Sequence, residues 1–153
     1  MKVKLNKIVG VLDAMKDQQT SYLNKQTGAI ITLEAEQIEA AKNGTGAPEG
    51  ASEKAQEAVK RAAEVLKDTE TYARLPLKSD IHEYKLMTNF SQTISNNTAA
   101  GMVKLSISGT GAFRRFKDVI TRYGLADDWD QYKYQAIAKI AGRWCEKNGV
   151  EYE

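Results

Sequence analysis

The chain has 153 residues, of which 42% are hydrophobic and 27% charged, a composition that can bury a core and excludes a wholly disordered protein. The formal net charge is only +2, which excludes a uniformly polybasic or polyacidic protein, so nucleic-acid binding would need a local patch. No stretch reaches the roughly 20 apolar residues that cross a bilayer, and the single cysteine, Cys145, excludes an intramolecular disulfide, so we expect one soluble, cytoplasmic domain over 1–153 without a membrane or disulfide partner.

The N-terminal part of the chain predicts a helix followed by a β-hairpin. Apolar residues recur at helical spacing over 6–17, and Asn6 stands where an N-cap belongs. In SYLNKQTGAIITL, Ser21–Leu33, two apolar or β-branched runs flank a polar turn in which Gly28 supplies the positive φ that such a turn needs. Helix formers then return over 34–42.

A glycine-rich segment and an alanine-rich helix follow. Residues 43–51, NGTGAPEGA, predict a flexible linker. Ser52 can cap the next helix, whose narrow, alanine-rich apolar stripe predicts shallow packing at the surface. The stretch 71–77, TYARLPL, predicts an extended strand that could add a third strand to the hairpin. In the helix that Ser52 caps, the apolar stripe consists of Val59, Ala62, Ala63 and Leu66.

The C-terminal half is predicted to be helical. One helix begins at Ser79 or Asp80 and ends at SNNT, 95–98. Residues 102–108 alternate as a strand would but also fit helical spacing, so the residues alone leave both structures open. The helix that begins at Ser79 or Asp80 should bury Ile81, Tyr84, Met87, Phe90 and Ile94.

Two further helices complete the chain. The first ends at Gly124, and its large apolar residues fall at i, i+3, i+7 and i+10, which predicts that they face the core. The last helix begins at Asp127 or Asp128 and ends at Asn148. These elements indicate an α+β fold, with a small antiparallel sheet and a helical C-terminal half. In the helix that ends at Gly124, the residues expected to face the core are Phe113, Phe116, Ile120 and Tyr123.

The residue types give little support to catalysis. His82 and Cys145 are the single histidine and the single cysteine, and their spacing indicates neither a catalytic couple nor a zinc site. The acidic run from Asp127 to Asp130 is typical of a helix start and lacks the spacing of a calcium loop. We therefore expect no catalytic residue, no metal and no cofactor.

One local segment favours binding. GTGAFRRFKDVITRYG, Gly109–Gly124, opens on Gly109 and Gly111 and carries four cations against one acid, Asp118. We interpret it as a basic helical face that binds a protein or nucleic-acid partner, for example in a phage-type inhibitor. Neighbouring acidic residues could lower its charge, because Asp118 is spaced to pair with the first cation and the run from Asp127 follows closely. The cations are Arg114, Arg115, Lys117 and Arg122.

Two alternatives remain open for the same segment. The turn Gly109–Gly111 with Arg114 and Arg115 could form an anion cradle in a phosphate- or small-ligand-binding protein, even an enzyme. It is neither a Walker loop nor a dinucleotide fingerprint, because the further glycine, lysine and hydroxyl positions of those motifs are missing. The glycines could also serve only to turn one helix into the next. Single-strand binding would need exposed aromatics, whereas core periodicity predicts that these are buried.

Five segments carry a resemblance to a known family. They are YLNKQTGAIITL, YARLPLKSD, YKLMTNF, GTGAFRRFKDVI and DDWDQYKYQAIAKIAGRWCEKNGVEY. With them the chain resembles a bacterial family known as uncharacterised protein family (UPF) 0158. The resemblance implies a helix before the glycine turn, so we expect helix over 99–108, and it implies that 44–68 is an insertion. It implies no activity and no catalytic residue.

Overall fold

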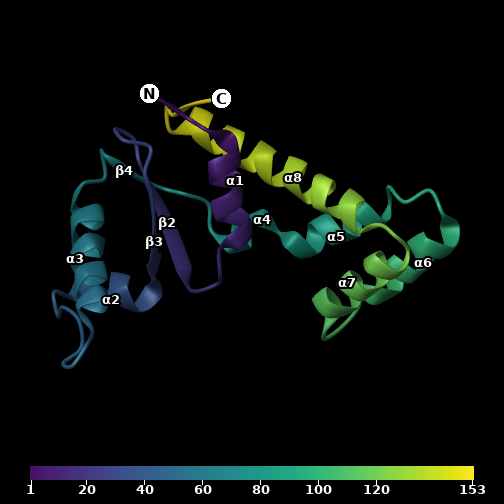
Figure 1. The fold of residues 1–153 in the computed structure, drawn as a ribbon, viewed down its shortest axis with the longest axis horizontal. Coiled ribbons are helices and arrows are strands. Elements are labelled where there is room, and N and C mark those ends of the chain that lie inside the picture. The colour runs from purple at the N-terminus through teal and green to yellow at the C-terminus, as the bar shows by residue number, and fades with distance from the viewer. The chain divides into compact units, whose positions relative to one another are not determined.

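The computed structural model describes residues 1–153, which fall into two compact units. The first unit comprises Met1–Asp80 and Ile140–Glu153, and the second comprises Ile81–Lys139. The last helix, α8 (Ala126–Lys147), contributes residues to both (Figure 1). The sequence predicts one domain over 1–153, and the structure presents two units, each with a hydrophobic cluster of its own. None of the helices combines the length and the apolar character needed to cross a bilayer.

The first unit contains a three-stranded antiparallel sheet. Its central strand is β2 (Gln19–Asn24), which pairs with β3 (Ile30–Glu34) on one side and β4 (Tyr72–Arg74) on the other. Leu23 is completely buried at the centre of this sheet. The predicted hairpin and third strand are therefore confirmed, and Gly28 has the expected positive φ, 77°. The α+β fold class is confirmed with them.

Two helices pack together beside the sheet. α2 (Ala35–Asn43) contacts both β3 and α3 (Glu53–Lys67) (Figure 1). Ala62 of α3 has no exposed surface and joins a core with Leu33 and Ile38. The expected shallow packing of α3 is wrong, because the helix packs against α2 and buries side chains on three successive positions of its apolar stripe. The side chains of α3 that are buried are Val59, Ala62 and Val65, so the predicted stripe is shifted at its C-terminal end.

Helix ends in this unit follow capping chemistry. Ser52 caps α3 as predicted, since its Oγ accepts a hydrogen bond from the amide of Ala55 at 3.2 Å. α2 ends at Gly44, whose φ of 66° is the left-handed conformation that glycine adopts readily. The helix α3 lies within the predicted insertion 44–68, and the flexibility of 43–51 stays a prediction.

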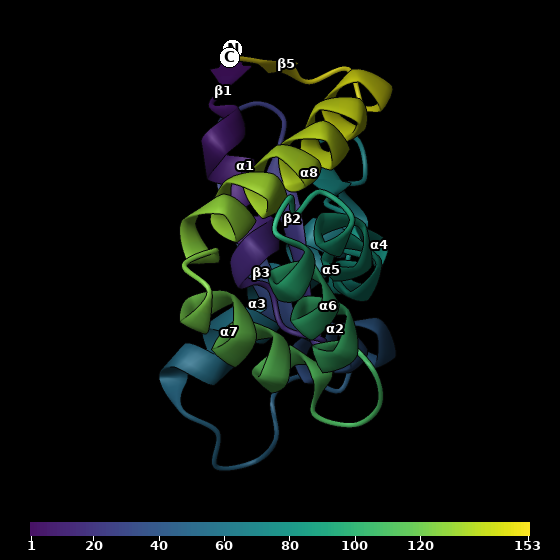
Figure 2. The same ribbon diagram turned by 90° about the vertical axis from the view of Figure 1, so that its right-hand side faces the viewer.

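The two chain ends meet in the first unit. β1 (Lys2–Val3) and β5 (Glu151–Tyr152) form a short parallel pair that brings the termini side by side (Figure 2). Strands of two residues carry no periodicity, which is why the sequence does not predict them. α1 (Leu5–Ala14) is shorter than the predicted helix 6–17, and Lys4 takes the N-cap position expected for Asn6.

The second unit is helical. α6 (Asn97–Ser106) packs on both α5 (Glu83–Ser91) and α7 (Ala112–Arg122) (Figure 2). The helix expected over 99–108 is confirmed to Ser106, and the strand alternative for 102–108 is wrong. Asn96 caps α6 by accepting from the amide of Ala99 at 3.0 Å.

The helix predicted to begin at Ser79 or Asp80 is divided in two. α4 (Lys78–Ile81) ends just before His82, whose φ of 52° is left-handed, and α5 begins at the residue after His82. A left-handed residue cannot continue a right-handed helix, and single-sequence periodicity does not reveal such a break. Tyr84, expected in the core, is half exposed, and its hydroxyl donates to the carbonyl oxygen of Ile107 at 2.6 Å.

An aromatic cluster forms the core of the second unit. The Phe116 and Trp129 rings meet edge to face with centroids 4.8 Å apart, and Phe90 lies 5.3 Å from Trp129. The cluster draws on α5, α6, α7 and α8, so it fixes the sides on which α7 is buried and exposed. Its buried members are Met87, Phe90, Val103, Ile107, Phe116, Ile120 and Trp129.

Candidate interaction surface on α7

One side of α7 packs against the aromatic core of the second unit. Ala112, Phe116 and Ile120 are buried, and they recur at i, i+4 and i+8 along the helix. The opposite side faces solvent over the length of the helix, and most of its residues are charged. The surface available to a partner is therefore determined by which residues share the outer side.

Phe113 lies at the border between the buried side and the outer side. The ring is 52% exposed, although Phe116, three residues further on, is completely enclosed. The expectation that Phe113 faces the core is wrong, because Ala112 occupies the buried position in the first turn of α7. The signal was present in the sequence, since the spacing from Ala112 to Phe116 and Ile120 is as helical as the spacing from Phe113.

The guanidinium group of Arg115 is bound by backbone carbonyl groups. Its Nε donates to the oxygen of Ser106 at 3.3 Å, Nη1 donates to Thr110 at 2.5 Å, and Nη2 donates to Ser108. Ser106 is the last residue of α6, and the other two belong to the turn before α7. Arg115 thus satisfies carbonyl groups at the C-terminal end of α6, where a cation is also favoured by the helix dipole.

The glycine turn has a polarity opposite to that of an anion cradle. A phosphate-binding nest points successive N–H groups at the anion, whereas here carbonyl oxygens converge on a cation. Gly109 and Gly111 have φ values of 75° and 79°, so they allow the chain to bend around Arg115. This geometry argues against Arg115 as a phosphate ligand in the alternative cradle formed by Gly109–Gly111 with Arg114 and Arg115.

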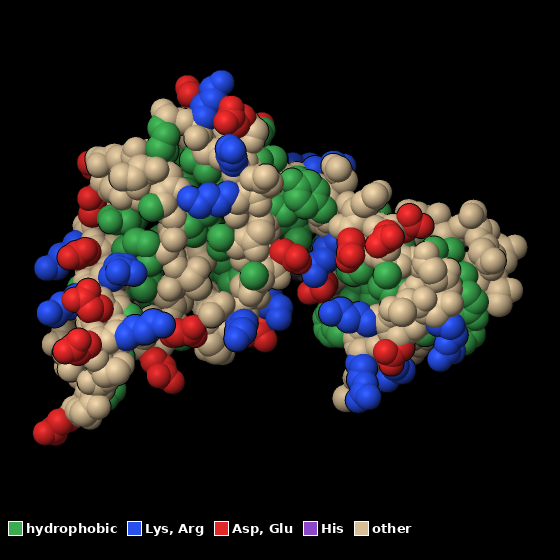
Figure 3. All heavy atoms as spheres, in the orientation of Figure 1, with side chains coloured by type: hydrophobic (Ala, Val, Ile, Leu, Met, Phe, Trp, Pro, Cys, Tyr) green, Lys and Arg blue, Asp and Glu red, His purple; other side chains and the backbone are tan.

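The other three cations of the segment are exposed. Arg114, Lys117 and Arg122 form no ion pair, either with Asp118, which is spaced to pair with Arg114, or with the acidic start of α8. Figure 3 shows Lys and Arg side chains gathered over α7, with an acidic side chain among them. We call Arg114, Lys117 and Arg122 the basic face. The aspartates at the start of α8 are Asp127, Asp128 and Asp130.

Backbone electrostatics reinforce the basic face at its N-terminal end. α7 begins after Gly111, has no side-chain cap and carries no acidic residue in its first turn. The partial positive charge of the helix N-terminus is therefore not offset by a side chain. Phe113 and Arg114 lie in that same turn, so an exposed aromatic ring and a cation stand at the positive end of the helix dipole.

A cleft with acidic side chains in its lining lies elsewhere in the second unit. It has a volume of about 750 Å³ and is lined by the end of α5, the loop over 92–96 and the first turns of α8. Phe90, Leu125 and Tyr132 give it apolar walls, and Asp128 and Asp130 add carboxylates. The carboxylates disfavour a polyanion, so we treat this cleft as separate from the basic face.

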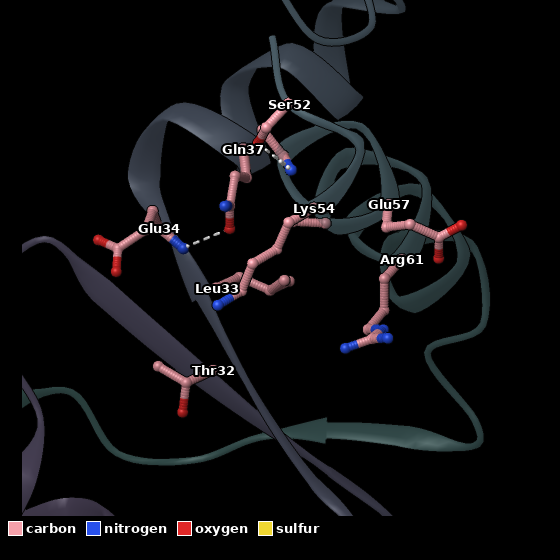
Figure 4. Close-up of a pocket in the computed structure, with 10 residues that line it drawn as sticks. Thr32, Leu33, Glu34, Gln37, Ser52, Lys54, Glu57 and Arg61 are labelled. Carbon is pink, nitrogen blue, oxygen red and sulfur yellow. Dashed lines mark hydrogen bonds between the residues drawn. The ribbon is translucent and has the colours of Figure 1, made fainter.

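A pocket of about 490 Å³ lies in the first unit between β3, the start of α2 and α3 (Figure 4). Lys54 extends from α3 toward Leu33, and Arg61 is the other cation of the lining. Glu34 and Glu57 match these charges, and the amide of Glu34 donates to Oε1 of Gln37 at 2.9 Å. No buried side-chain polar atom of the chain lacks a hydrogen bond.

Cys145 and His82 both lie at positions that suit a structural role. Cys145 is completely buried, and burial raises the pKa of its thiol, which disfavours the thiolate that a nucleophile needs. His82 occupies the left-handed break between α4 and α5. No group of three or more His, Cys, Asp or Glu side chains is placed to hold a metal ion.

Comparison with protein-family models, with curated proteins and with solved structures finds no match to this chain. The resemblance to UPF 0158 therefore stays a prediction. The fold and the surface together define a two-unit α+β protein with an exposed basic helix, and its function has to be argued from that surface.

Proposed function

We propose that this chain is a non-enzymatic binding protein that docks a polyanionic partner on the basic face of α7. The single observation that carries the proposal is that Arg114, Lys117 and Arg122 are exposed and free of ion pairs. Cations that are not neutralised by their own protein are available to phosphate or carboxylate groups of a partner, and they attract such a partner over several ångströms.

Arg115 supports the basic face without belonging to it. Three of its five N–H donors are engaged by backbone carbonyl groups, which hold the guanidinium group against the turn and leave it fewer donors for a partner. Its charge remains and adds to the positive potential around α7, where Asp118 is the one acidic residue. We therefore assign partner contacts to Arg114, Lys117 and Arg122, and a structural role to Arg115.

Binding to labelled single-stranded and duplex oligonucleotides and to heparin, measured by fluorescence anisotropy, tests the proposal. The triple variant Arg114→Ala/Lys117→Ala/Arg122→Ala should lose most of its affinity for every polyanion. A matched variant removes the same charge from exposed positions of α3, Lys54→Ala/Lys60→Ala/Lys67→Ala, and should bind as the wild type does. If wild type binds none of these polyanions, or if both triple variants are equally weakened, the proposal fails.

An acidic protein is the second candidate partner. It is favoured by the exposed side chains of Leu105, at 69%, and Phe113, at 52%, because protein interfaces combine apolar anchors with a charged rim. An inhibitor-type protein that docks on an enzyme would be one form of it. Capture of a stoichiometric partner that is lost on Leu105→Asp would support this candidate, and capture unaffected by that change would contradict it.

A further inference from the structure

We propose that the partner of the basic face is a single-stranded nucleic acid and that Phe113 stacks on one of its bases. This inference rests on the proposed function and specifies the partner class. It starts from an apolar ring that the fold leaves outside: Phe113 is 52% exposed, and it takes no part in the ring contacts that join Phe90, Phe116, Trp129 and Tyr132.

The exposed neighbour of Phe113 along its own side of the helix is a cation. Lys117 lies four residues further on, which places it one turn along the same side of α7, whereas Arg114, the next residue in the chain, is turned by about 100° toward the outer side. An aromatic ring beside cations that follow a backbone is the arrangement by which single-strand-binding proteins hold a base and its flanking phosphates. Thr121 continues this side one turn beyond Lys117, and α7 extends over about 16 Å, which suits a few nucleotides.

The same arrangement suits a duplex less well. In a duplex the base faces are covered by stacking, so a ring on a protein surface has no base face to contact unless the duplex is opened. A single strand can place its bases on Phe113 and keep its phosphates on the cationic positions.

The acidic start of α8 limits the path of the strand. Asp127 and Asp128 lie in the first turn of α8, a few residues after Arg122, and no cation of the basic face pairs with them. Their carboxylates repel a phosphate backbone that continues past the C-terminal end of α7. The strand is therefore held along the side of α7 that runs from Phe113 through Lys117 to Thr121, with the base contact at the N-terminal end.

The test compares Phe113→Ala and Phe113→Trp with wild type in binding to oligo(dT), oligo(U), the matching duplexes and heparin. Stacking of one base predicts that Phe113→Ala weakens binding to both single strands about 10-fold and leaves heparin binding unchanged. Phe113→Trp should restore the single-strand affinity. Tyr134→Ala removes another exposed aromatic of the same unit and should change nothing.

The outcomes separate the two proposals. If Phe113→Ala binds single strands as wild type does, or weakens heparin binding equally, stacking is overturned while the polyanion-binding function stands. If wild type prefers the duplexes, the single-strand assignment is overturned as well. If no polyanion binds at all, both proposals fall.

Discussion

Nε of Arg115, in the second turn of α7, donates to the carbonyl oxygen of Ser106, the last residue of α6, at 3.3 Å. With the bonds to Ser108 and Thr110, one side chain holds the whole turn between two consecutive helices. The neighbouring cation, Arg114, makes no such bond and is exposed. Two adjacent arginines therefore have separate roles, the second structural and the first available to a partner.

Arg115→Ala should lower the free energy of unfolding by about 1–2 kcal/mol, because several carbonyl groups lose a charged donor. Arg115→Lys should recover little of it, since one ammonium group cannot match three carbonyl oxygens as a planar fork does. Urea denaturation followed by tryptophan fluorescence measures both. Arg114→Ala is the control and should stay within about 0.5 kcal/mol of wild type. Equal effects of Arg114→Ala and Arg115→Ala would contradict the division of roles.

Phe116→Ala and Phe113→Ala should differ sharply in stability. Phe116 is enclosed by Phe90 and Trp129, so its truncation should cost about 3–5 kcal/mol. Phe113→Ala should change the free energy of unfolding by no more than about 0.5 kcal/mol, since half of the ring is already in water. The same denaturation experiment decides, and a large loss for Phe113→Ala would mean that the ring is part of the core.

His82→Gly should stabilise the protein slightly, by about 0.5 kcal/mol, because glycine adopts the left-handed conformation without steric cost, although it loses more chain entropy on folding. His82→Val should destabilise it by more than about 1 kcal/mol, since a β-branched residue is strained at a φ of 52°. Thermal unfolding of the two variants beside wild type measures the difference. The opposite order of stabilities would show that the helix is not broken at His82.

Stability should fall at alkaline pH through Cys145. Burial, and then the nearby Glu146 carboxylate, raises the pKa of this thiol in the folded chain. Above about pH 8.5 the unfolded chain releases the thiol proton while the folded chain keeps it. The free energy of unfolding therefore decreases as the pH rises from the thiol pKa of the unfolded chain to the higher pKa of the folded chain. Urea denaturation as a function of pH should show a steeper alkaline decline for wild type than for Cys145→Ala. Parallel pH profiles of the two proteins would contradict this assignment.

Much of the fold follows from local patterns. The turn ending at Gly28 predicts the hairpin, and Ser52 predicts the start of α3, because both depend on chemistry within a few residues. The division of the helix at His82 could not be predicted, since no sequence rule places a histidine in the left-handed region. The β1–β5 pair depends on contacts between residues at the two ends of the chain, which periodicity does not report.

The candidate surface was only partly predictable. Local charge density identified Arg114, Lys117 and Arg122, and the structure shows them free of ion pairs. The role of Arg115 could not be inferred, because its partners are backbone carbonyl groups that any sequence would supply. Phe113 was misplaced because Phe and Ala compete for one buried position at the start of α7, and residue size alone favoured the larger.

The salt dependence of oligo(dT) binding tests the central claim most directly. If Arg114, Lys117 and Arg122 each neutralise one phosphate, the logarithm of the association constant should fall against the logarithm of salt concentration with a slope of about −2. Each single alanine variant of the basic face should make that slope shallower by about 0.7, and Arg115→Ala, whose charge contributes to the potential without contacting a phosphate, should change it less than any of them. A wild-type slope near zero, or a slope that responds to Arg115→Ala and not to the basic face, would contradict the account.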